Sequence, residues 1–285
     1  MFFQLATSGI ATGCAYALIA LGFVMIWNTA SVVNFAQGEF VVIAMFVALT
    51  CHVTLGWPLW LVLPIAVLIP ALVGYATERV VIRPVIGAAE MTVVTVTIGL
   101  QIVLSDAAKI IYGGQPYSFP PLIEGRPLSI LGIVVPRQSL VVIASMVVLA
   151  VGLHFLSQKT SFGKRLRAVS QDRETAKLMG IDVNRTIAEG FALSAGIAGV
   201  AGVLLAPIIY VSAGLGLPLL IKSFIAAIIG GFGSYIGALI GGLLIGVLDN
   251  LVGFYISSHY REVFTFLVLI LVLLVRPQGL FPHHR

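Results

Sequence analysis

Charged and amide side chains interrupt the long apolar stretches of this 285-residue sequence. In the segment NTASVVNFAQGEF at 28–40, Asn34, Gln37 and Glu39 adjoin two apolar runs. An ionisable group is costly in apolar surroundings, so these residues are candidates for contact with a polar or charged ligand. An Asn at a helix N-cap with Gln three residues later also fits a capping box, which would place Glu39 in the first helical turn. The segment therefore has two interpretations, a structural helix start and a ligand contact.

Other apolar stretches carry polar residues as well. Asp249 and Asn250 lie within the stretch 235–256, toward its outer half, and threonines with Gln101 form a polar stripe along another stretch. Asp106 and Lys109 are spaced to pair on one helix. A hydrogen bond or ion pair inside a bundle is the simpler interpretation of each residue, and ligand contact is the alternative. The candidates for ligand contact are Asn34, Gln37, Glu39, Thr95, Gln101, Asp249 and Asn250.

The residue patterns typical of enzymes are absent from the sequence. It has no evident nucleophile–base pair, metal cluster or paired catalytic carboxylates. It also lacks the G-x-x-x-x-G-K-[ST] phosphate loop that an ATPase needs. Its two cysteines, Cys14 and Cys51, lie in apolar segments and form no CxxC or Cys/His pattern. We therefore expect no catalytic residue, metal or cofactor, and a membrane-embedded enzyme is the weakest interpretation.

Composition indicates the elements that hold these residues. Apolar residues make up 59% of the chain, charged residues 9%, and the mean hydropathy is +1.10, whereas a soluble domain carries about 25% charged residues. We predict an all-α integral membrane protein, a single domain over 1–285 with about eight (seven to nine) transmembrane helices. The short segment 218–232 fits either a half-helix or re-entrant segment or a full span. The segment 35–53 is a second uncertain span, because it starts with polar residues. The candidate spans are 5–27, 35–53, 58–78, 91–112, 139–157, 187–211, 218–232, 235–256 and 262–276.

Charge is concentrated in the loop 158–185, which contains seven of the 16 basic residues. Basic loops tend to remain in the cytoplasm, so we place this loop and the C-terminus there. The proline- and glycine-rich loop 113–138 then faces outside. No basic stripe with interleaved aromatic residues occurs, so the charge does not indicate nucleic-acid binding.

Part of this charged loop has the pattern of a short helix. Ser170 could cap it, with Asp172 and Glu174 in the first turn. Lys177 would lie near its end, and Gly180 would terminate it. The pattern predicts a docking surface for a cytoplasmic partner, with a purely topogenic loop as the alternative. The residues assigned to the surface are Ser170, Asp172, Arg173, Glu174, Ala176, Lys177, Met179 and Gly180.

The segment ETAKLMG at 174–180 is similar to the E-A-A-x-x-x-G motif of ABC importer permeases. Glu174, Ala176 and Gly180 match the motif, and Thr175 replaces its second residue. Nearly the whole chain resembles the LivH-type branched-chain amino acid permeases. The resemblance is carried, in order along the chain, by ALIALGFVMIWNTASVVNFAQGEF, SFGKRLRAVSQDRETAKLMGID, FALSAGIAGVAGVL, IIGGFGSYIGALIGGLLIGVLDN and RPQGLF.

The resemblance implies a permease subunit of an ATP-driven importer in the cytoplasmic (inner) membrane of a bacterium. It implies a second homologous permease chain, two ABC ATPase subunits that hydrolyse the ATP, and an extracytoplasmic solute-binding protein. In that family, the motif helix couples the permease to its ATPase. The solute would be a branched-chain or other apolar amino acid, although related permeases handle urea or short amides. The alternative is a secondary transporter in which Glu39, Asp106 or Asp249 carries a coupled proton or sodium ion.

Overall fold

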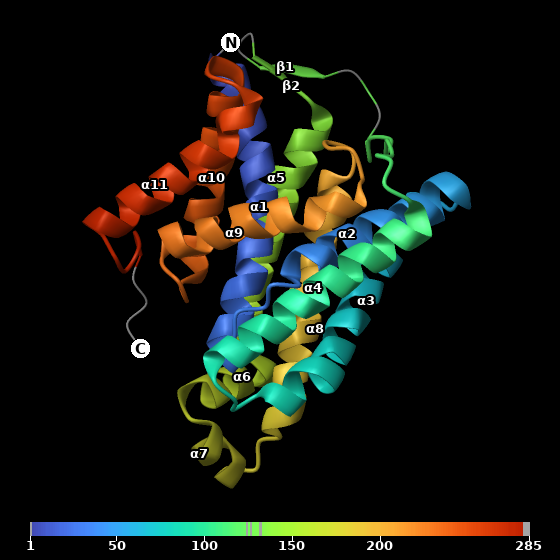
Figure 1. Cartoon of the computed structure of the whole chain (residues 1–285). Helices are drawn as coiled ribbons and strands as arrows, with labels where there is room; N and C mark the ends of the chain where they lie inside the picture. Colours follow the sequence, from blue (N-terminus) through green and yellow to red (C-terminus); the bar gives the residue numbers. More distant parts are fainter. Residues whose placement is uncertain (1, 124, 126, 131–132, 282–285) are drawn as a thin grey trace.

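The computed structural model describes residues 2–123, 125, 127–130 and 133–281, and most of them are helical (Figure 1). Within these residues, nine helical segments are long and apolar enough to cross a membrane. The prediction of an all-α polytopic membrane protein is confirmed. The count is one above the expected eight, because the segments Gln37–Thr54 and Ala213–Gly230 both reach spanning length when their irregular turns are included.

Eleven α-helices are present in the described part of the chain. Their bounds are α1 Phe2–Ala30, α2 Gln37–Ala48, α3 Leu59–Thr77, α4 Glu90–Tyr112, α5 Arg137–Lys159, α6 Ser161–Gln171, α7 Arg173–Leu178, α8 Val183–Leu205, α9 Gly216–Gly230, α10 Tyr235–Tyr255 and α11 Arg261–Val275. Short π-helical turns extend α2 over Leu49–Thr54 and α3 over Glu78–Ile82, and single 3-10 turns lie at Arg83–Val85, Ala213–Leu215 and Ser258–Tyr260.

A small β-ribbon lies in the loop 113–138, which the all-α prediction did not anticipate. Strand β1 (Leu128–Ile130) pairs antiparallel with β2 (Ile133–Val135), with Leu128 opposite Val135. Both strands are rich in Leu, Ile and Val, and the β-branched members favour extended backbone. The ribbon lies beside the N-terminal end of α5 (Figure 1) and does not change the fold class.

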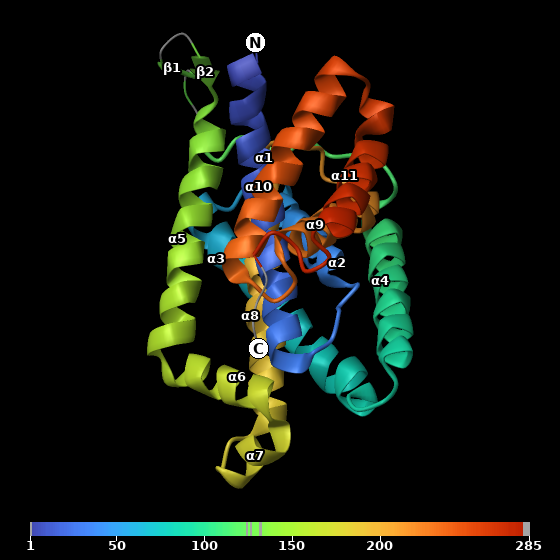
Figure 2. The same ribbon diagram turned by 90° about the vertical axis from the view of Figure 1, so that its left-hand side faces the viewer.

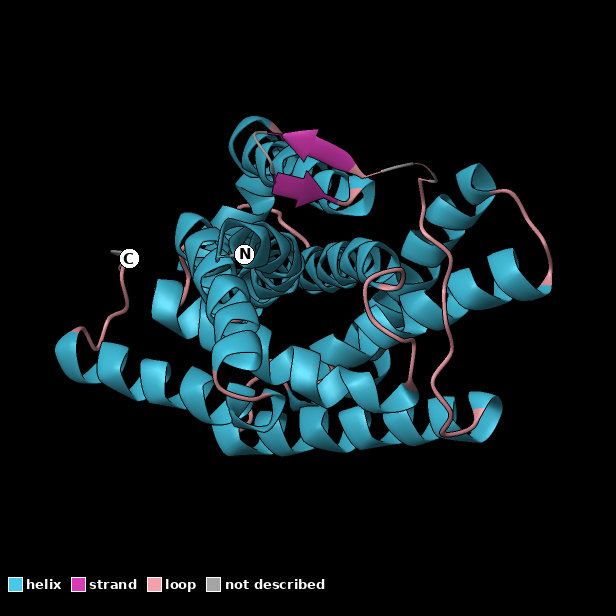
Figure 3. Ribbon diagram, turned by 90° about the horizontal axis from the view of Figure 1, so that it is seen from above, coloured by secondary structure: helices cyan, strands magenta, loops and turns pink. Residues whose placement is uncertain are grey.

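Helix α1 is seen end-on at the N label in Figure 3, and its Leu18 and Phe23 are fully buried. It packs against α10 along a seam of small residues. At Gly13 and Gly246 the two backbones come so close that a Cβ on Gly246 would overlap the Gly13 backbone. Close backbone approach is a main source of packing energy between helices in lipid, where no hydrophobic force draws them together.

Several outer helices expose large apolar side chains. Leu72 of α3, Val148 of α5 and Leu274 of α11 are all more than half exposed. On a protein in water such surfaces would be a liability. On this bundle, they form the contact with lipid acyl chains or with another apolar helix.

Two helices begin inside the bundle rather than at its ends. The chain leaves α1 at Ala30 and starts α2 only at Gln37, and α9 runs across α1 for 15 residues (Figures 1 and 2). The starts of α2 and α9 meet, because a Cβ on Gly38 would overlap the Gly216 carbonyl oxygen. A helix of 15 residues rises about 22 Å, short of the roughly 30 Å hydrocarbon core. With the 3-10 turn Ala213–Leu215 the segment reaches spanning length, so a re-entrant course stays a prediction; the two segments do bring two helix starts together.

Candidate functional site

The segment between α1 and α2 does not form the capping box expected from its sequence. Ala36 stands at the N-cap of α2, and Asn34 Oδ1 instead accepts a hydrogen bond from the Ala36 N–H at 3.1 Å. The helix starts two residues later than the box requires, so Asn34 lies in the preceding loop. Gln37 reaches α8, donating to the Ser194 carbonyl at 3.3 Å and accepting from the Ser194 hydroxyl at 3.2 Å. Glu39 does lie in the first turn of α2, as predicted.

Glu39 is a buried carboxylate, only 1% exposed. Gln101 of α4 donates to its Oε1 at 3.0 Å. The carboxylate also lies against the start of α9, where a Cβ on Gly216 would overlap it. No Lys, Arg or His among the described residues forms an ion pair with Glu39. The carboxylate thus meets an amide and the positive ends of two helix dipoles, and within the described residues no cation is paired with it directly.

Two buried polar pairs flank the start of α2, and we call them together the central polar cluster. In one pair Gln37 contacts Ser194 of α8, and in the other Glu39 contacts Gln101 of α4. Ser194 also donates to the Gly22 carbonyl at 2.8 Å, so it links α8 to α1. Ser194 was not a sequence candidate, because a lone serine in a glycine-rich helix gives no signal above an ordinary packing residue.

The threonine stripe on α4 divides between two faces of the helix. Thr95 is exposed and donates to the Met91 carbonyl of its own helix, so it lies away from the central polar cluster. Thr97 is fully buried and reaches the Val33 carbonyl at 3.4 Å. The structure therefore brings Gln101 to Glu39 and Thr97 to the segment 31–36 that precedes α2. Thr95 contacts neither of them.

Asp249 belongs to a second buried group, which we call the Asp249 cluster: Tyr16, Lys222, Asp249 and Arg261. Lys222 Nζ lies 2.8 Å from Asp249 Oδ1, and the Tyr16 hydroxyl donates to Oδ2 at 3.4 Å. Arg261 Nη1 is 3.9 Å from the same Oδ2. These four residues join α9, α10, α1 and α11. This carboxylate is thus already paired with cations of the protein.

The remaining membrane candidates make local contacts. Asn250 donates to the Thr12 hydroxyl at 3.4 Å and to the Gly246 carbonyl at 3.1 Å, within the α1–α10 seam. Asp106 and Lys109 form the ion pair expected from their spacing, with 2.8 Å between Oδ1 and Nζ, and both side chains are at least half exposed. None of these three belongs to the central polar cluster.

The charged loop folds as two helices, α6 and α7, rather than one. Thr160 caps α6 by accepting from the Gly163 N–H at 3.1 Å. Asp172 caps α7, accepting from the N–H groups of Glu174 at 2.9 Å and Thr175 at 3.2 Å. The prediction that Ser170 is the cap is wrong, because Ser170 lies in the last turn of α6.

The acidic cap of α7 is held strongly in its charged form. The Thr175 hydroxyl donates to Asp172 at 2.6 Å, in addition to the two backbone N–H groups. These hydrogen bonds, that of the hydroxyl first, lower the pKa of Asp172 below its usual range. Gly180 adopts a φ of +78° after the helix, so it terminates the helix as predicted.

One side of helix α7 packs against the rest of the molecule, and its other side is exposed. Ala176 is 3% exposed, and Arg173 donates to the Ala30 carbonyl at the end of α1. Glu174 and Lys177 form an exposed pair with 2.8 Å between Oε1 and Nζ. Met179 does not share the buried face of Ala176, because it lies beyond the last helical residue and is 78% exposed. Together with Leu178, 88% exposed, it makes an apolar tip at this end of the molecule.

Residues 5–273 match the family described as the branched-chain amino acid transport system / permease component. The chain is 32% identical to the high-affinity branched-chain amino acid transport system permease protein BraD of Pseudomonas aeruginosa, over 98% of this chain and 95% of that protein. It is likewise 32% identical to the corresponding protein LivH of Escherichia coli, with the same coverage. A more distant relative is the ribose import permease protein RbsC of Haemophilus influenzae, at 27% identity over 90% of this chain and 80% of that protein.

The fold is similar to a solved structure, PsaBC from Streptococcus pneumoniae in complex with Fab. The TM-score is 0.51 and the match covers 98% of this chain and 93% of that one. Because the sequences are only 15% identical, this similarity concerns the fold alone.

Proposed function

Because the chain belongs to the family of branched-chain amino acid transport permeases, we propose that it is the membrane-spanning subunit of an ATP-driven importer for branched-chain or other apolar amino acids. The proposal places it in the cytoplasmic (inner) membrane of a bacterium. The basic residues of α6 and α7 support an orientation with these helices and the C-terminus in the cytoplasm.

The proposed complex contains a second homologous permease chain, two ABC ATPase subunits and an extracytoplasmic solute-binding protein. The absence of a phosphate loop from the sequence supports ATP hydrolysis by partner chains. Conformational changes of the ATPase subunits would then be transmitted to this chain through a contact surface. The role of this chain is that of a permease without enzymatic activity of its own.

The observation that carries the proposal is the form of α7. A helix with a capped start, a buried anchor and an exposed apolar tip at Leu178 and Met179 is suited to insertion into a groove on another protein. The charged Glu174 and Lys177 flank that tip and would set its orientation. The same helix contacts the end of α1 through Arg173.

This contact suggests how motion would reach the solute. Arg173 touches the carbonyl of Ala30, the last residue of α1, and the break at 31–36 leads from there to Glu39. Displacement of α7 by an ATPase would therefore shift the segment that holds the central polar cluster. ATP binding and hydrolysis would favour one of two bundle arrangements, outward or inward, by their different contacts with α7.

The central polar cluster is the proposed solute contact. An amino acid carries a cationic ammonium, and Glu39 offers a carboxylate that forms no ion pair within the described part of the chain. The apolar residues of α2 and α9 would surround an aliphatic side chain. Since Glu39 is closed off from solvent in this arrangement, the bundle must open for the ammonium to reach it.

One observation favours a second candidate function. A buried carboxylate without a protein counter-ion is also what a proton- or sodium-coupled secondary transporter would use. That function requires transport by this chain alone, driven by an ion gradient. It would leave the exposed tip of α7 without a role.

The test separates the two functions with α7 variants in the complete complex. The double substitution Leu178→Ser with Met179→Ser should preserve membrane insertion but reduce ATPase co-purification and leucine uptake at least tenfold, because it removes the apolar tip. The matched control, Leu178→Ile with Met179→Leu, should behave as the unaltered protein. Single substitutions Glu174→Ala and Gly180→Ala should uncouple uptake from ATP hydrolysis.

Unchanged uptake in all of these variants would overturn the coupling assignment. Ion-driven leucine uptake by the isolated chain in liposomes would establish the secondary transporter instead. Competition of labelled leucine uptake by urea, acetamide and other apolar amino acids would then define the solute class.

A further inference from the structure

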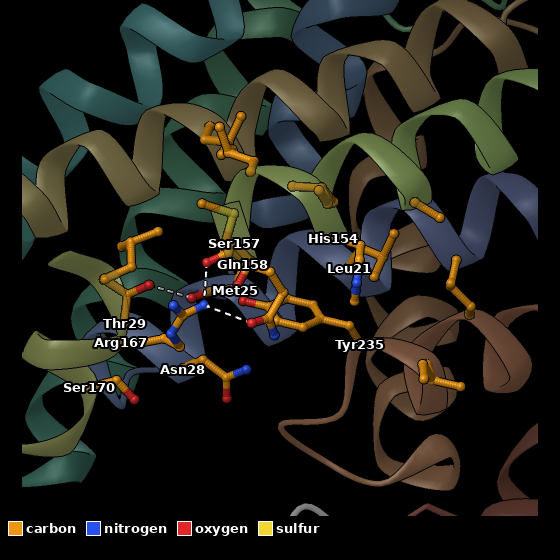
Figure 4. A pocket seen from close by; sticks show the side chains of 17 residues that line it. Leu21, Met25, Asn28, Thr29, His154, Ser157, Gln158, Arg167, Ser170 and Tyr235 are labelled. Atoms are coloured by element: carbon orange, nitrogen blue, oxygen red, sulfur yellow. Dashed lines mark hydrogen bonds between the residues drawn. The ribbon is translucent and has the colours of Figure 1, made fainter. Parts of the chain in front are cut away.

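A cavity of about 240 Å³ lies between α1, α5, α6 and α10, apart from the central polar cluster (Figure 4). Most of its wall is aliphatic, with Leu21 and Met25 of α1 on one side and Leu153 of α5 on another. Leu239 of α10 also lines it. The residues proposed above for translocation and coupling do not form the apolar wall of this cavity. A ligand that binds here would therefore have a separate role.

One end of the cavity is polar. Figure 4 shows Arg167 of α6 at this end, close to Ser157 and Gln158 of α5, with Asn28 and Ser170 nearby. Arg167 Nη1 donates to the Ser157 carbonyl and to Gln158 Oε1. No acidic residue lines the cavity.

The charge of Arg167 is therefore not neutralised. Its two acceptors are uncharged, and within the described residues it takes part in no ion pair. Its neighbour Arg165, in contrast, pairs with Glu189 at 3.1 Å. A guanidinium with free donors is well matched to a phosphate group.

The position of the cavity relative to the ends of the membrane spans indicates which kind of phosphate compound would fit. Helix α5 ends at Lys159, and α6 then runs across the end of the bundle (Figure 2). Arg167 thus lies where the apolar spans end, at the level of lipid headgroups, while the aliphatic part of the cavity extends into the hydrocarbon region. Basic pockets between helices on the cytoplasmic side are typical binding sites of anionic lipids.

We propose that this cavity binds an anionic phospholipid, with one acyl chain among Leu21, Leu153 and Leu239 and the phosphate on Arg167. A soluble phosphate compound would use only the polar end and leave the aliphatic wall in contact with water. The lipid would join α5 and α6 to α1 and α10, and it would steady α6. Since α7 follows α6 after a single residue, Asp172, the lipid would also support the helix to which coupling is assigned above, a consequence that rests on the proposed function.

The test uses the delipidated complex in mild detergent, titrated with phosphatidylglycerol or with phosphatidylcholine. Melting temperature and native mass spectrometry report binding. We expect phosphatidylglycerol to bind more tightly and to raise the melting temperature more. Arg167→Gln should weaken phosphatidylglycerol binding about fivefold and leave phosphatidylcholine binding unchanged, since one basic residue near an anionic membrane surface contributes about 1 kcal/mol.

The matched control is Lys164→Gln on the same helix. Lys164 is exposed and does not line the cavity, so its removal should not change the lipid preference. A second variant, Ala150→Phe, fills the apolar part of the cavity and should block both lipids at this site. A phosphatidylglycerol with a photoreactive acyl chain should label peptides of α1, α5 and α10 in the unaltered protein and not in Ala150→Phe.

Three results would overturn the proposal. Equal losses in Arg167→Gln and Lys164→Gln would mean general attraction to anionic surfaces. Unchanged preference in Arg167→Gln would mean that the headgroup lies elsewhere, and labelling confined to other helices would mean that the acyl chain does. The proposed importer function is tested by uptake, so lipid binding can fail without affecting it.

Discussion

Glu39 and Asp249 are buried carboxylates in the same bundle, yet their surroundings differ. Both are at most 3% exposed, and each is held by residues from other helices. Asp249 has Lys222 at 2.8 Å, and the Tyr16 hydroxyl adds a hydrogen bond. Glu39 has only the amide of Gln101 at 3.0 Å and the starts of two helices.

This difference separates a structural carboxylate from one that is available for a ligand. A charge in an apolar interior persists only where something compensates it. For Asp249 the compensation is complete within the protein, and it connects α9, α10 and α1. For Glu39 a full positive charge is missing, and the ammonium of an amino acid could supply it.

The largest expected effect is on the Asp249 cluster. Asp249→Ala should lower the free energy of unfolding by about 3–5 kcal/mol, because it leaves Lys222 buried without its partner. Thermal denaturation in detergent measures the change. The double variant Asp249→Leu with Lys222→Met should recover much of the loss. If Asp249→Ala proves as stable as the unaltered protein, the cluster is not structural and Asp249 returns to the pathway.

Glu39→Gln should have the opposite profile. The amide keeps the shape and an acceptor for Gln101, so the melting temperature should change little. Loss of the charge should raise the KM for leucine uptake about 10- to 100-fold, since a hydrogen bond to a charged group contributes about 1.5–3 kcal/mol. Uptake kinetics in the complete complex test this. A normal KM together with a lowered melting temperature would place Glu39 in the same class as Asp249.

Gly216→Ala should disturb the site of Glu39 sterically. Its methyl group would overlap the carboxylate, so the Glu39 side chain or the start of α9 must move, at a cost of about 1–3 kcal/mol. We expect reduced stability and reduced uptake. Gly99→Ala on α4 is the control, because a Cβ there meets no atom within 4 Å. Equal behaviour of the two variants would show that the two helix starts are not tightly packed.

The smallest effect concerns Asp172, an exposed carboxylate that is compensated only by hydrogen bonds. Because its pKa is lowered in the folded protein, its contribution is fully present above the ordinary aspartate value of 3.8 and is lost as pH falls through the folded pKa below it. Protection of the Glu174 and Thr175 amides from exchange should therefore be constant at neutral pH and fall only in strong acid. In Asp172→Asn this pH dependence should vanish; its persistence would assign the titration to another group.

The sequence by itself determined the class of the molecule. Apolar stretches of about 20 residues specify membrane helices whatever their neighbours, because backbone groups in lipid must be satisfied within the segment. The short charged helix and its glycine stop at Gly180 were predictable from local signals, which are acidic residues in the first turn and a glycine that adopts positive φ. The local pair of Asp106 and Lys109 was predictable too, since three residues on a helix bring side chains together.

Only the tertiary structure decided which polar residues meet. Glu39 meets Gln101 of α4, and Gln37 meets Ser194 of α8, although no local rule aligns these helices. Which side of α4 faces the core determines that Thr97 is buried and Thr95 exposed, and a helix with apolar residues on all sides gives no period from which to read this. Tertiary structure also decides which residue caps a helix. Thr160 and Asp172 cap α6 and α7, and Ser170 does not, because the chain turns at 160 and 172. Helix formation is a local property of the chain, whereas the pairing of buried charges depends on how the helices pack.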